Sequence, residues 1–242
     1  HFDGTDWLQQ AEREDVKLPF RAIISDANPR THQKVLVASE LDKEGDTSWR
    51  VSRSCSVQRE PARLAAIAEP LLRISRQVRF VDPYFSPDKP RYQKSYCAFL
   101  ERISRCNPQL LKVEFHLEFK TDRRGQPPPP VHCFAKLCHE LLAHQTPSRF
   151  NVVFHRWQQR LSGDIFHRRM VLTERGGIAF DVGLDRGSPG EFTDVDLLSA
   201  ELHARHWQTF NASGPDERLN LVDSTILRFD TQTRQWQAAN AS

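Results

Sequence analysis

Short apolar runs alternate with amphipathic stretches along most of the chain. Runs rich in β-branched and aromatic residues predict strands at 20–25, 34–40, 77–85, 112–119, 150–156, 165–173, 177–182 and 219–229. Apolar residues at helical spacing predict helices at 61–76, 91–104, 131–144 and 195–210. Strands that alternate with helices of this length predict an α/β, or mixed α+β, protein in which helices flank a mixed β-sheet.

The pattern favours one domain. Residues 1–60 are expected to supply N-terminal strands of the same sheet, and residues 61–242 are expected to form the main domain. A polyproline run at 127–130 is expected to be a stiff surface connector, with a docking motif as the alternative.

Composition limits the class of protein. Apolar residues make up 38% and charged residues 27% of the 242 residues, which is ordinary for a globular protein. The sequence has no run long enough to span a bilayer and no signal-peptide pattern. The five cysteines are scattered without a C-x-x-C pair, which favours reduced thiols in a cytoplasmic protein. The histidines and cysteines between 132 and 144 fit no zinc-site spacing, so no metal site is expected.

Positive charge concentrates in one segment although the net charge is only +3. Between residues 149 and 169 there are five arginines and one acid, with aromatic residues interleaved. This combination suits phosphate contact and base stacking, and it predicts substrate contacts at Arg156, Trp157, Arg160 and Arg168. The alternative is a solvated face whose aromatic side chains turn into the core.

The most informative segment is 166–177, where His167 and Arg169 precede an apolar run, an acid and paired glycines. Residues i and i+2 of a strand point to one face, so a strand here would place the imidazole and the guanidinium side by side. Histidine can attack phosphorus as a nucleophile, and arginine grips phosphate oxygens with a bidentate fork.

These residues resemble the phospholipase D superfamily, whose signature is H-x-K-x4-D. His167 takes the histidine position, Arg169 replaces the lysine and Glu174 replaces the aspartate. The Val-Asp-Pro-Tyr-Phe run at 81–85 is similar to strand ends of bacterial members. The resemblance implies a phospholipase-D-like sheet over roughly 60–230, a His167 nucleophile that forms a phosphohistidine, phosphate binding by Arg169 and orientation of a histidine by Glu174. It implies no metal or other cofactor.

The reaction needs a second histidine, for which two sources are open. Half-size members of the superfamily dimerise and pair one motif from each subunit, which implies a homodimer. Alternatively, His32 and Lys34 begin a degenerate internal copy of the motif before an apolar run.

Two functions follow from the resemblance. The first is a metal-independent phosphodiesterase, in particular a nuclease within a bacterial antiphage defence or restriction assembly. Nucleic acid is favoured over lipid by the arginines and aromatic residues near the motif. The second is an inactive binding module for nucleic acid, phosphoinositide or a protein, because Gly183-Leu184-Asp185 resembles the phospholipase-D-like C-terminal domain of MIT-domain proteins.

Three further candidates come from their positions in the predicted elements. Asp82 ends a strand, where ligand sites gather; the alternative is that its side chain hydrogen-bonds a turn. Arg59 precedes a helix and could meet a phosphate there. Glu114, His116 and Glu118 share one face of a strand, and a solvent face is the favoured interpretation.

Overall fold

The computed structural model describes residues 6–17, 20–41, 52–119, 127–159, 166–211, 219–221 and 225–240. The chain divides into two units, residues 1–52 and residues 53–242.

The smaller unit contains α1 (Trp7–Lys17), β1 (Ile23–Ser25), β2 (Val35–Val37) and the 3₁₀ turn η1 (Ala38–Glu40). β1 and β2 pair in parallel with each other, and Leu8, Ile23 and Val35 form a small core between these elements. The prediction that residues 1–60 join the main sheet is thus wrong for β1 and β2, which form a two-stranded sheet of their own. It holds for β3 (Ser54–Gln58), which pairs with β9 in the large sheet.

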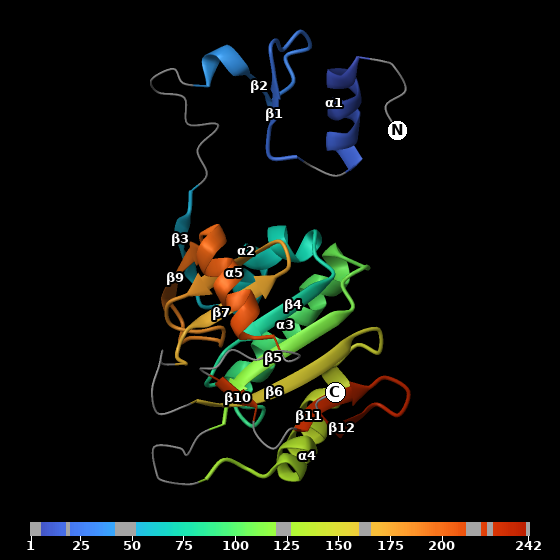
Figure 1. The fold of residues 1–242 in the computed structure, drawn as a ribbon, viewed down its shortest axis with the longest axis vertical. Coiled ribbons are helices and arrows are strands. Elements are labelled where there is room, and N and C mark those ends of the chain that lie inside the picture. The colour runs from blue at the N-terminus through green and yellow to red at the C-terminus, as the bar shows by residue number, and fades with distance from the viewer. Residues whose placement is uncertain are drawn as a thin grey trace. The chain divides into compact units, whose positions relative to one another are not determined.

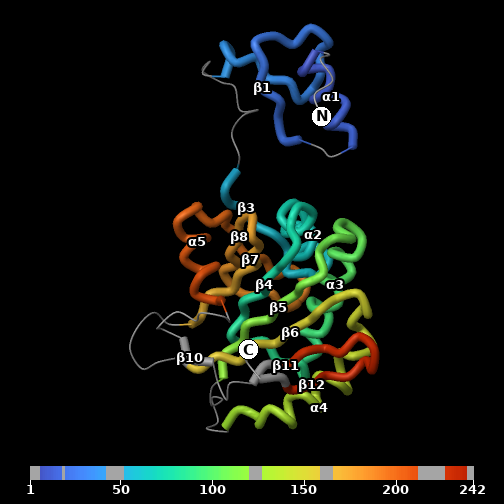
Figure 2. The backbone as a smooth tube through the Cα atoms, turned by 45° about the vertical axis from the view of Figure 1, so that its right-hand side comes forward, coloured from blue at the N-terminus to red at the C-terminus, as the bar shows by residue number. Residues whose placement is uncertain are grey.

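The larger unit is built on one mixed sheet. Its strands are β3, β4 (Gln77–Val81), β5 (Lys112–Glu118), β6 (Asn151–Gln159), β7 (Arg169–Thr173), β8 (Gly176–Phe180), β9 (Phe192–Leu197), β10 (Leu219–Leu221), β11 (Thr225–Asp230) and β12 (Gln235–Asn240). The order is β12-β11-β6-β5-β4-β7-β8-β9-β3, and β10 pairs with β6. The central strands β4, β5 and β6 are parallel and lie side by side (Figures 1 and 2), whereas β4 and β7 are antiparallel.

Helices flank this sheet (Figure 1), so the predicted mixed α/β class is confirmed. The helices α2 (Pro61–Arg73), α3 (Pro90–Cys106) and α4 (Val131–Leu142) pack on one face, against Phe80, Phe115 and Phe154. The opposite face carries Val81, Trp157 and Met170, which pack with Phe210 and Trp207 at the end of α5 (Ala200–Thr209). Burial of a large apolar side chain contributes about 1.5–3 kcal/mol, so both faces contribute to stability. No helix in the described part of the chain has the length and apolar character needed to cross a membrane.

One predicted helix is a strand and a shorter helix in the structure. The sequence predicts a helix at 195–210, but β9 occupies 192–197 and α5 begins only at Ala200. Thr193 and Val195 are buried while their neighbours are exposed, which is the period of two that a half-buried strand requires. Ser199 then begins the helix, because its hydroxyl accepts a hydrogen bond from the N–H of Leu202 at 3.3 Å.

Candidate functional site

The carboxyl ends of the parallel strands meet the start of β7 at one edge of the sheet. The register pairs Val81 at the end of β4 with Met170 of β7, and Arg169 with Phe180 at the end of β8. Asp82, Arg169 and the segment after β8 are therefore brought together. In open α/β sheets this edge is where ligands bind.

A cleft of about 1150 Å³ occupies this edge. The charged side chains that line it are Arg59, Asp82, Asp88, Lys89, Arg91, Glu118, Arg156, Arg169 and Asp185. The apolar and aromatic lining includes Tyr84, Phe85, Leu117, Pro127, Pro128, Pro129, Phe134 and Leu137. The first turn of the 17-residue helix α3 also borders it, and a helix N-terminus favours anions. The cleft therefore combines charged groups of both signs with apolar and aromatic surface.

Asp82 is the most deeply placed acid of the cleft, with 3% of its surface exposed. Its Oδ1 accepts a hydrogen bond from the N–H of Tyr84 at 3.0 Å, an Asx turn that its position before Pro83 favours. Its Oδ2 is buried and has no partner of normal hydrogen-bond geometry among the described residues. Burial raises the pKa of Asp82 to about 6, and the N–H groups of Tyr84 and Leu184 only partly oppose this.

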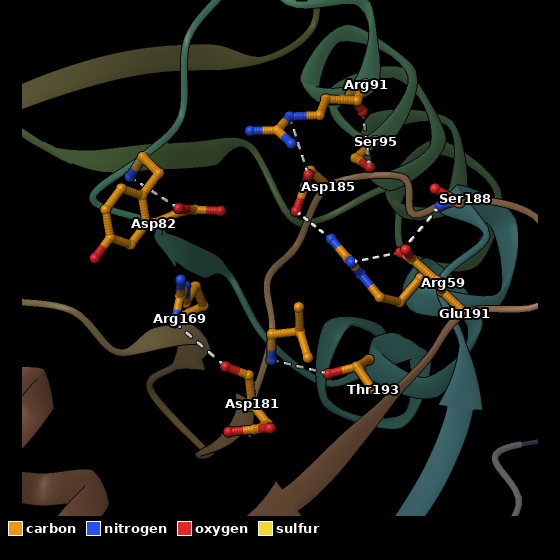
Figure 3. A network of polar contacts seen from close by, with 12 residues as sticks. Arg59, Asp82, Arg91, Ser95, Arg169, Asp181, Asp185, Ser188, Glu191 and Thr193 are labelled. Carbon is orange, nitrogen blue, oxygen red and sulfur yellow. Dashed lines mark hydrogen bonds and ion pairs between the residues drawn. The ribbon is translucent and has the colours of Figure 1, made fainter. Parts of the chain in front are cut away.

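Arg169 enters the cleft from the first position of β7. It donates a hydrogen bond to the backbone carbonyl of Asp181 at 3.3 Å, and its guanidinium lies 4.7 Å from the centre of the Tyr84 ring. Figure 3 shows Asp82 and Arg169 approaching each other from neighbouring strands. The guanidinium is half-buried, so its charge is only partly screened by solvent.

Two neighbouring arginines of the cleft are paired with acids (Figure 3). Arg59 binds Asp185 and Glu191, each at 2.8 Å, and Arg91 binds the second oxygen of Asp185 at 3.2 Å. Gly183 permits this arrangement, because a Cβ there would lie 2.5 Å from Oδ1 of Asp185. Arg59, considered from the sequence as a phosphate contact, does line the cleft, but it mainly fixes the loop after β8.

Replacement of Asp82 by asparagine is expected to raise the melting temperature at pH 8 by roughly 5 °C and to change it little at pH 4. The pKa of Asp82 is raised from 3.8 to about 6, so the native state binds more protons than the unfolded state between these values. The stability contributed by the protonated carboxyl is complete below pH 3.8 and is lost as the pH rises through about 6. Thermal melts at both pH values test this, and a variant less stable than wild type at pH 8 would contradict it.

His167 and Arg168 lie outside the cleft lining. β7 begins at Arg169, so His167 precedes the strand, and both His167 and Arg168 are exposed. The prediction that His167 and Arg169 share one face of a strand is therefore wrong. The structure brings Arg169 and Asp82 into the cleft, but not His167.

Glu174 lies at the far end of β7 from Arg169. It accepts hydrogen bonds from the backbone N–H groups of Arg76 at 2.5 Å and Gln77 at 3.2 Å, so it caps the start of β4. The five residues of β7 separate the two ends by roughly 13 Å. Glu174 therefore has a structural role, and the predicted orientation of the His167 imidazole by this carboxylate is wrong.

The basic, aromatic stretch contributes less to the site than its composition predicts. Trp157 is 0% exposed and donates its indole N–H to Nδ1 of His116 at 2.9 Å, so it cannot stack on a substrate. Arg156 lines the cleft, but it donates to the carbonyl of Pro129 at 2.6 Å and lies over the rings of Phe119 and Phe134. This hydrogen bond holds the polyproline run in place as one wall of the cleft. Arg160 lies outside the described residues.

His32 and Lys34, the possible internal copy, lie in the smaller unit. Nδ1 of His32 accepts a hydrogen bond from the backbone N–H of Lys34 at 3.3 Å. The Lys34 ammonium pairs with Asp15 at 2.9 Å. Lys34 thus forms an ion pair within that unit.

A second polar cluster is buried under the face covered by α5. Glu114, His116 and His155 come from β5 and β6, and their ligand atoms lie within 4.8 Å of one another. The two imidazole rings stack with centroids 4.7 Å apart, and Phe210 packs edge-on against His116. The preference for a solvent face for Glu114 and His116 is wrong, because Phe210 and its neighbours cover them.

The protonation of His116 argues against a metal in this cluster. The Trp157 indole can only donate, so Nδ1 of His116 is the unprotonated nitrogen and a neutral ring carries its proton on Nε2. That proton faces Glu114, whose Oε2 lies 3.8 Å away, where a metal would need a lone pair. Arg79 and Lys112 already pair with Glu114, each at 2.9 Å. The donor set therefore does not fit a divalent cation.

Burial and nearby charged side chains determine which groups of this cluster are ionised. Burial lowers the pKa of His116 to about 3, which keeps the ring neutral at pH 7. Burial alone would raise the pKa of Glu114, but contacts with His116 and His155 outweigh it and hold that pKa well below its usual range. Glu114 is therefore a buried carboxylate that Arg79 and Lys112 neutralise.

Comparison with known proteins does not identify a family for this chain. No family model matches the sequence, and no curated protein matches it. Among solved structures the chain is similar to TrmBL2, an archaeal chromatin protein described as showing a novel mode of DNA binding, with 10% sequence identity and a TM-score of 0.34. The similarity covers 67% of this chain and 52% of that protein, so the chain spans about half the length of TrmBL2. At this level of similarity the comparison assigns the chain neither to a family nor to a ligand.

Proposed function

We propose that residues 53–242 form a binding module for a phosphate-bearing ligand, with Arg169 as the principal phosphate contact. The proposal rests on the contacts that the Arg169 guanidinium makes in the cleft. It contacts one backbone carbonyl and one aromatic ring, and among the described residues no carboxylate forms an ion pair with it. Arg59 and Arg91, in contrast, are both paired with Asp185. An anion would complete the coordination of the guanidinium.

The surroundings of Arg169 support an anionic ligand. The first turn of α3 borders the same cleft, and the dipole of this helix adds partial positive charge there. Lys89, the residue that precedes α3, is exposed at the rim. Five cations face four acids across the lining.

The geometry supports binding better than hydrolysis. A phosphohistidine mechanism needs His167, Arg169 and a second imidazole around one phosphate. Arg169 lines the cleft without His167, and His116 and His155 are buried below Phe210 and Trp157. A homodimer, a defence assembly, a nucleic-acid or lipid partner and a cytoplasmic location stay predictions from the sequence.

The binding proposal is tested by comparing Arg169→Gln with Arg168→Gln. Both variants remove one arginine charge, but only Arg169 lines the cleft. With a fluorescent single-stranded oligonucleotide at low salt, Arg169→Gln is expected to weaken binding about 10-fold to 100-fold, the effect of one charge-assisted contact. Arg168→Gln is expected to weaken it about twofold. Equal losses in both variants, or binding that Arg169→Gln leaves intact, would contradict the proposal.

Hydrolysis of an aryl phosphodiester in EDTA separates the two functions. Binding without chemistry predicts no turnover above the rate without protein. Turnover that survives chelation and disappears in His167→Ala would instead establish the phosphodiesterase hypothesis.

A further inference from the structure

Helix α5 covers a buried polar cluster without burying a side chain of its own. None of its ten residues is fully buried, and Phe210, which follows the helix, is the side chain that packs edge-on against His116. An element with few buried apolar contacts is the kind that opens locally while the rest of a fold stays intact. α5 and Phe210 are therefore suited to move away from the sheet together.

The contacts of His203 and Trp207 attach α5 to the sheet. Nε2 of His203 donates to the carbonyl of Thr173 at 2.7 Å. Arg79 donates to the carbonyl of Trp207 at 2.5 Å, and its guanidinium lies 3.7 Å from the centre of the Trp207 ring. Because Arg79 also pairs with Glu114, the helix and the buried cluster share one anchor.

The closed arrangement leaves His116 no place for a second proton. Nδ1 of its ring accepts the indole N–H of Trp157 at 2.9 Å, and the single proton of the neutral ring is on Nε2. A further proton on Nδ1 would face the indole donor directly. The imidazolium would also stack on His155, whose ring centre lies 4.7 Å away. Burial accordingly lowers the pKa of His116 to about 3.

The charged groups around His116 come from all the strands packed against it. Glu114 of β5 attracts a proton to the ring, whereas His155 of β6 and Arg79 of β4 oppose one. Lys112 pairs with Glu114 at 2.9 Å, which weakens that attraction. The titratable residues of α5 itself are Glu201, His203, Arg205 and His206.

We propose that α5 and Phe210 form an acid-sensitive lid, which closes over neutral His116 and opens when this imidazole takes up a proton. Removal of Phe210 lets the ring turn away from Trp157, so that Nδ1 meets water and binds a solvent proton. Histidine is the side chain whose ordinary titration makes such a switch responsive near neutral pH. The inference does not depend on the phosphate ligand.

The lid lies directly behind the edge of the cleft. It packs over Val81 and Met170, which adjoin Asp82 and Arg169 in the sequence. Opening of the lid removes apolar packing next to these two cleft residues, so acidity would act on the cleft from the opposite face of the sheet.

The expected size of the effect follows from proton linkage. The pKa of His116 is about 3 when the lid is closed and is expected to return to its ordinary value of 6.5 when the lid is open. The open state therefore binds more protons between these values. The stability of the closed lid is complete above pH 6.5 and is lost as the pH falls below it. From pH 7.5 to pH 5 the equilibrium constant for opening is expected to rise about 30-fold.

Hydrogen exchange of the whole chain at pH 7.5 and pH 5, corrected for the intrinsic rates of exchange, measures this opening. The amides of α5, such as that of Phe210, which donates to the carbonyl of His206, are expected to open about 30-fold more often at pH 5. The amides of β5 and β6 are expected to change much less, because the strand ladder stays paired when the lid opens.

His116→Asn isolates the titrating group. The asparagine oxygen can accept the indole N–H of Trp157 in place of Nδ1, but the amide does not titrate. The ratio of the opening constants at the two pH values is expected to fall below about threefold. His203→Gln is the matched control, because glutamine keeps an N–H donor for the carbonyl of Thr173 and leaves His116 intact. It is expected to retain the wild-type ratio.

Trp157→Phe tests the same contact from the other side. Without the indole donor, Nδ1 of His116 can take up a proton while the lid is closed, so the ratio is expected to fall below that of wild type. This variant and the wild-type comparison of α5 with β5 decide the matter even if His116→Asn does not fold.

Three results would overturn the inference. The first is a wild-type ratio near one in α5. The second is the full wild-type ratio in His116→Asn or in Trp157→Phe. The third is acceleration of β5 and β6 amides at pH 5 to the same extent as those of α5, which would show that the whole unit unfolds rather than the lid alone.

Discussion

Glu114→Leu is expected to lower the free energy of unfolding by about 3–5 kcal/mol, the usual effect of leaving a buried charge without its partner. Glu114 is 4% and Arg79 6% exposed, and their side chains meet at 2.9 Å. Arg79 also donates to the carbonyl of Trp207 at 2.5 Å and lies 3.7 Å from the centre of its ring. Loss of the carboxylate therefore disturbs the attachment of α5 to the sheet. Urea unfolding at pH 7 measures the effect.

The double variant Arg79→Leu/Glu114→Leu provides the control. It removes both buried charges together, so it is expected to be more stable than Glu114→Leu although it has one more substitution. The pKa of Glu114 is held below its usual range, so the pair stabilises the fold above the unfolded pKa of 4.5 and this contribution is lost as the pH falls below it. A loss of less than about 1 kcal/mol in Glu114→Leu would contradict the burial of this ion pair.

Asn107→Ala is expected to cost about 2–4 kcal/mol, because it removes four hydrogen bonds from a buried position. The Asn107 amide donates to the carbonyls of Leu72 at 2.7 Å and Ser75 at 2.6 Å. Its oxygen accepts from the N–H groups of Gln109 at 2.9 Å and Leu110 at 3.2 Å. One side chain thus joins the end of α2 and the segment after it to the turn between α3 and β5.

Asn107→Asp tests the same contacts without a change in size. At pH 7 the carboxylate would face the carbonyls of Leu72 and Ser75, so we expect a loss at least as large as that of the alanine variant. At pH 4 the carboxyl can donate again, and the difference from wild type is expected to shrink. Full stability of either variant at pH 7, measured by urea unfolding, would exclude this role for Asn107.

The sequence predicted the main sheet better than it predicted which surfaces are covered. The predicted strand at 112–119 is β5 in the structure, and its Phe115 and Leu117 lie in the core. Alternation cannot show whether a second layer covers the other face, and here α5 and Phe210 bury His116 there. Trp157 was predicted to contact substrate because it lies among arginines, but it is a core residue, as the alternative interpretation of that stretch expected.

The candidate site could be predicted in part. Asp82 was found because a polar residue at the end of a strand lies where ligands gather. Arg169 was found from its spacing after His167, although His167 itself lies outside the cleft lining. The role of Glu174 could not be inferred from spacing, since it depends on where β7 begins and on its contact with the start of β4. Asp185 and Gly183 were noted only for a family resemblance, although a glycine before a buried acid is a signal of close approach.

Hydrogen exchange of the whole chain, with and without a single-stranded oligonucleotide, tests most directly whether the ligand occupies this cleft. The account predicts slower exchange after ligand addition in residues 82–92 and 181–187, which border the cleft, and little change in residues 23–37 of the smaller unit. Arg169→Gln should abolish the slowing at the same ligand concentration. Slowing confined to other segments, or slowing that persists unchanged in Arg169→Gln, would contradict a phosphate site at the carboxyl edge of the parallel strands.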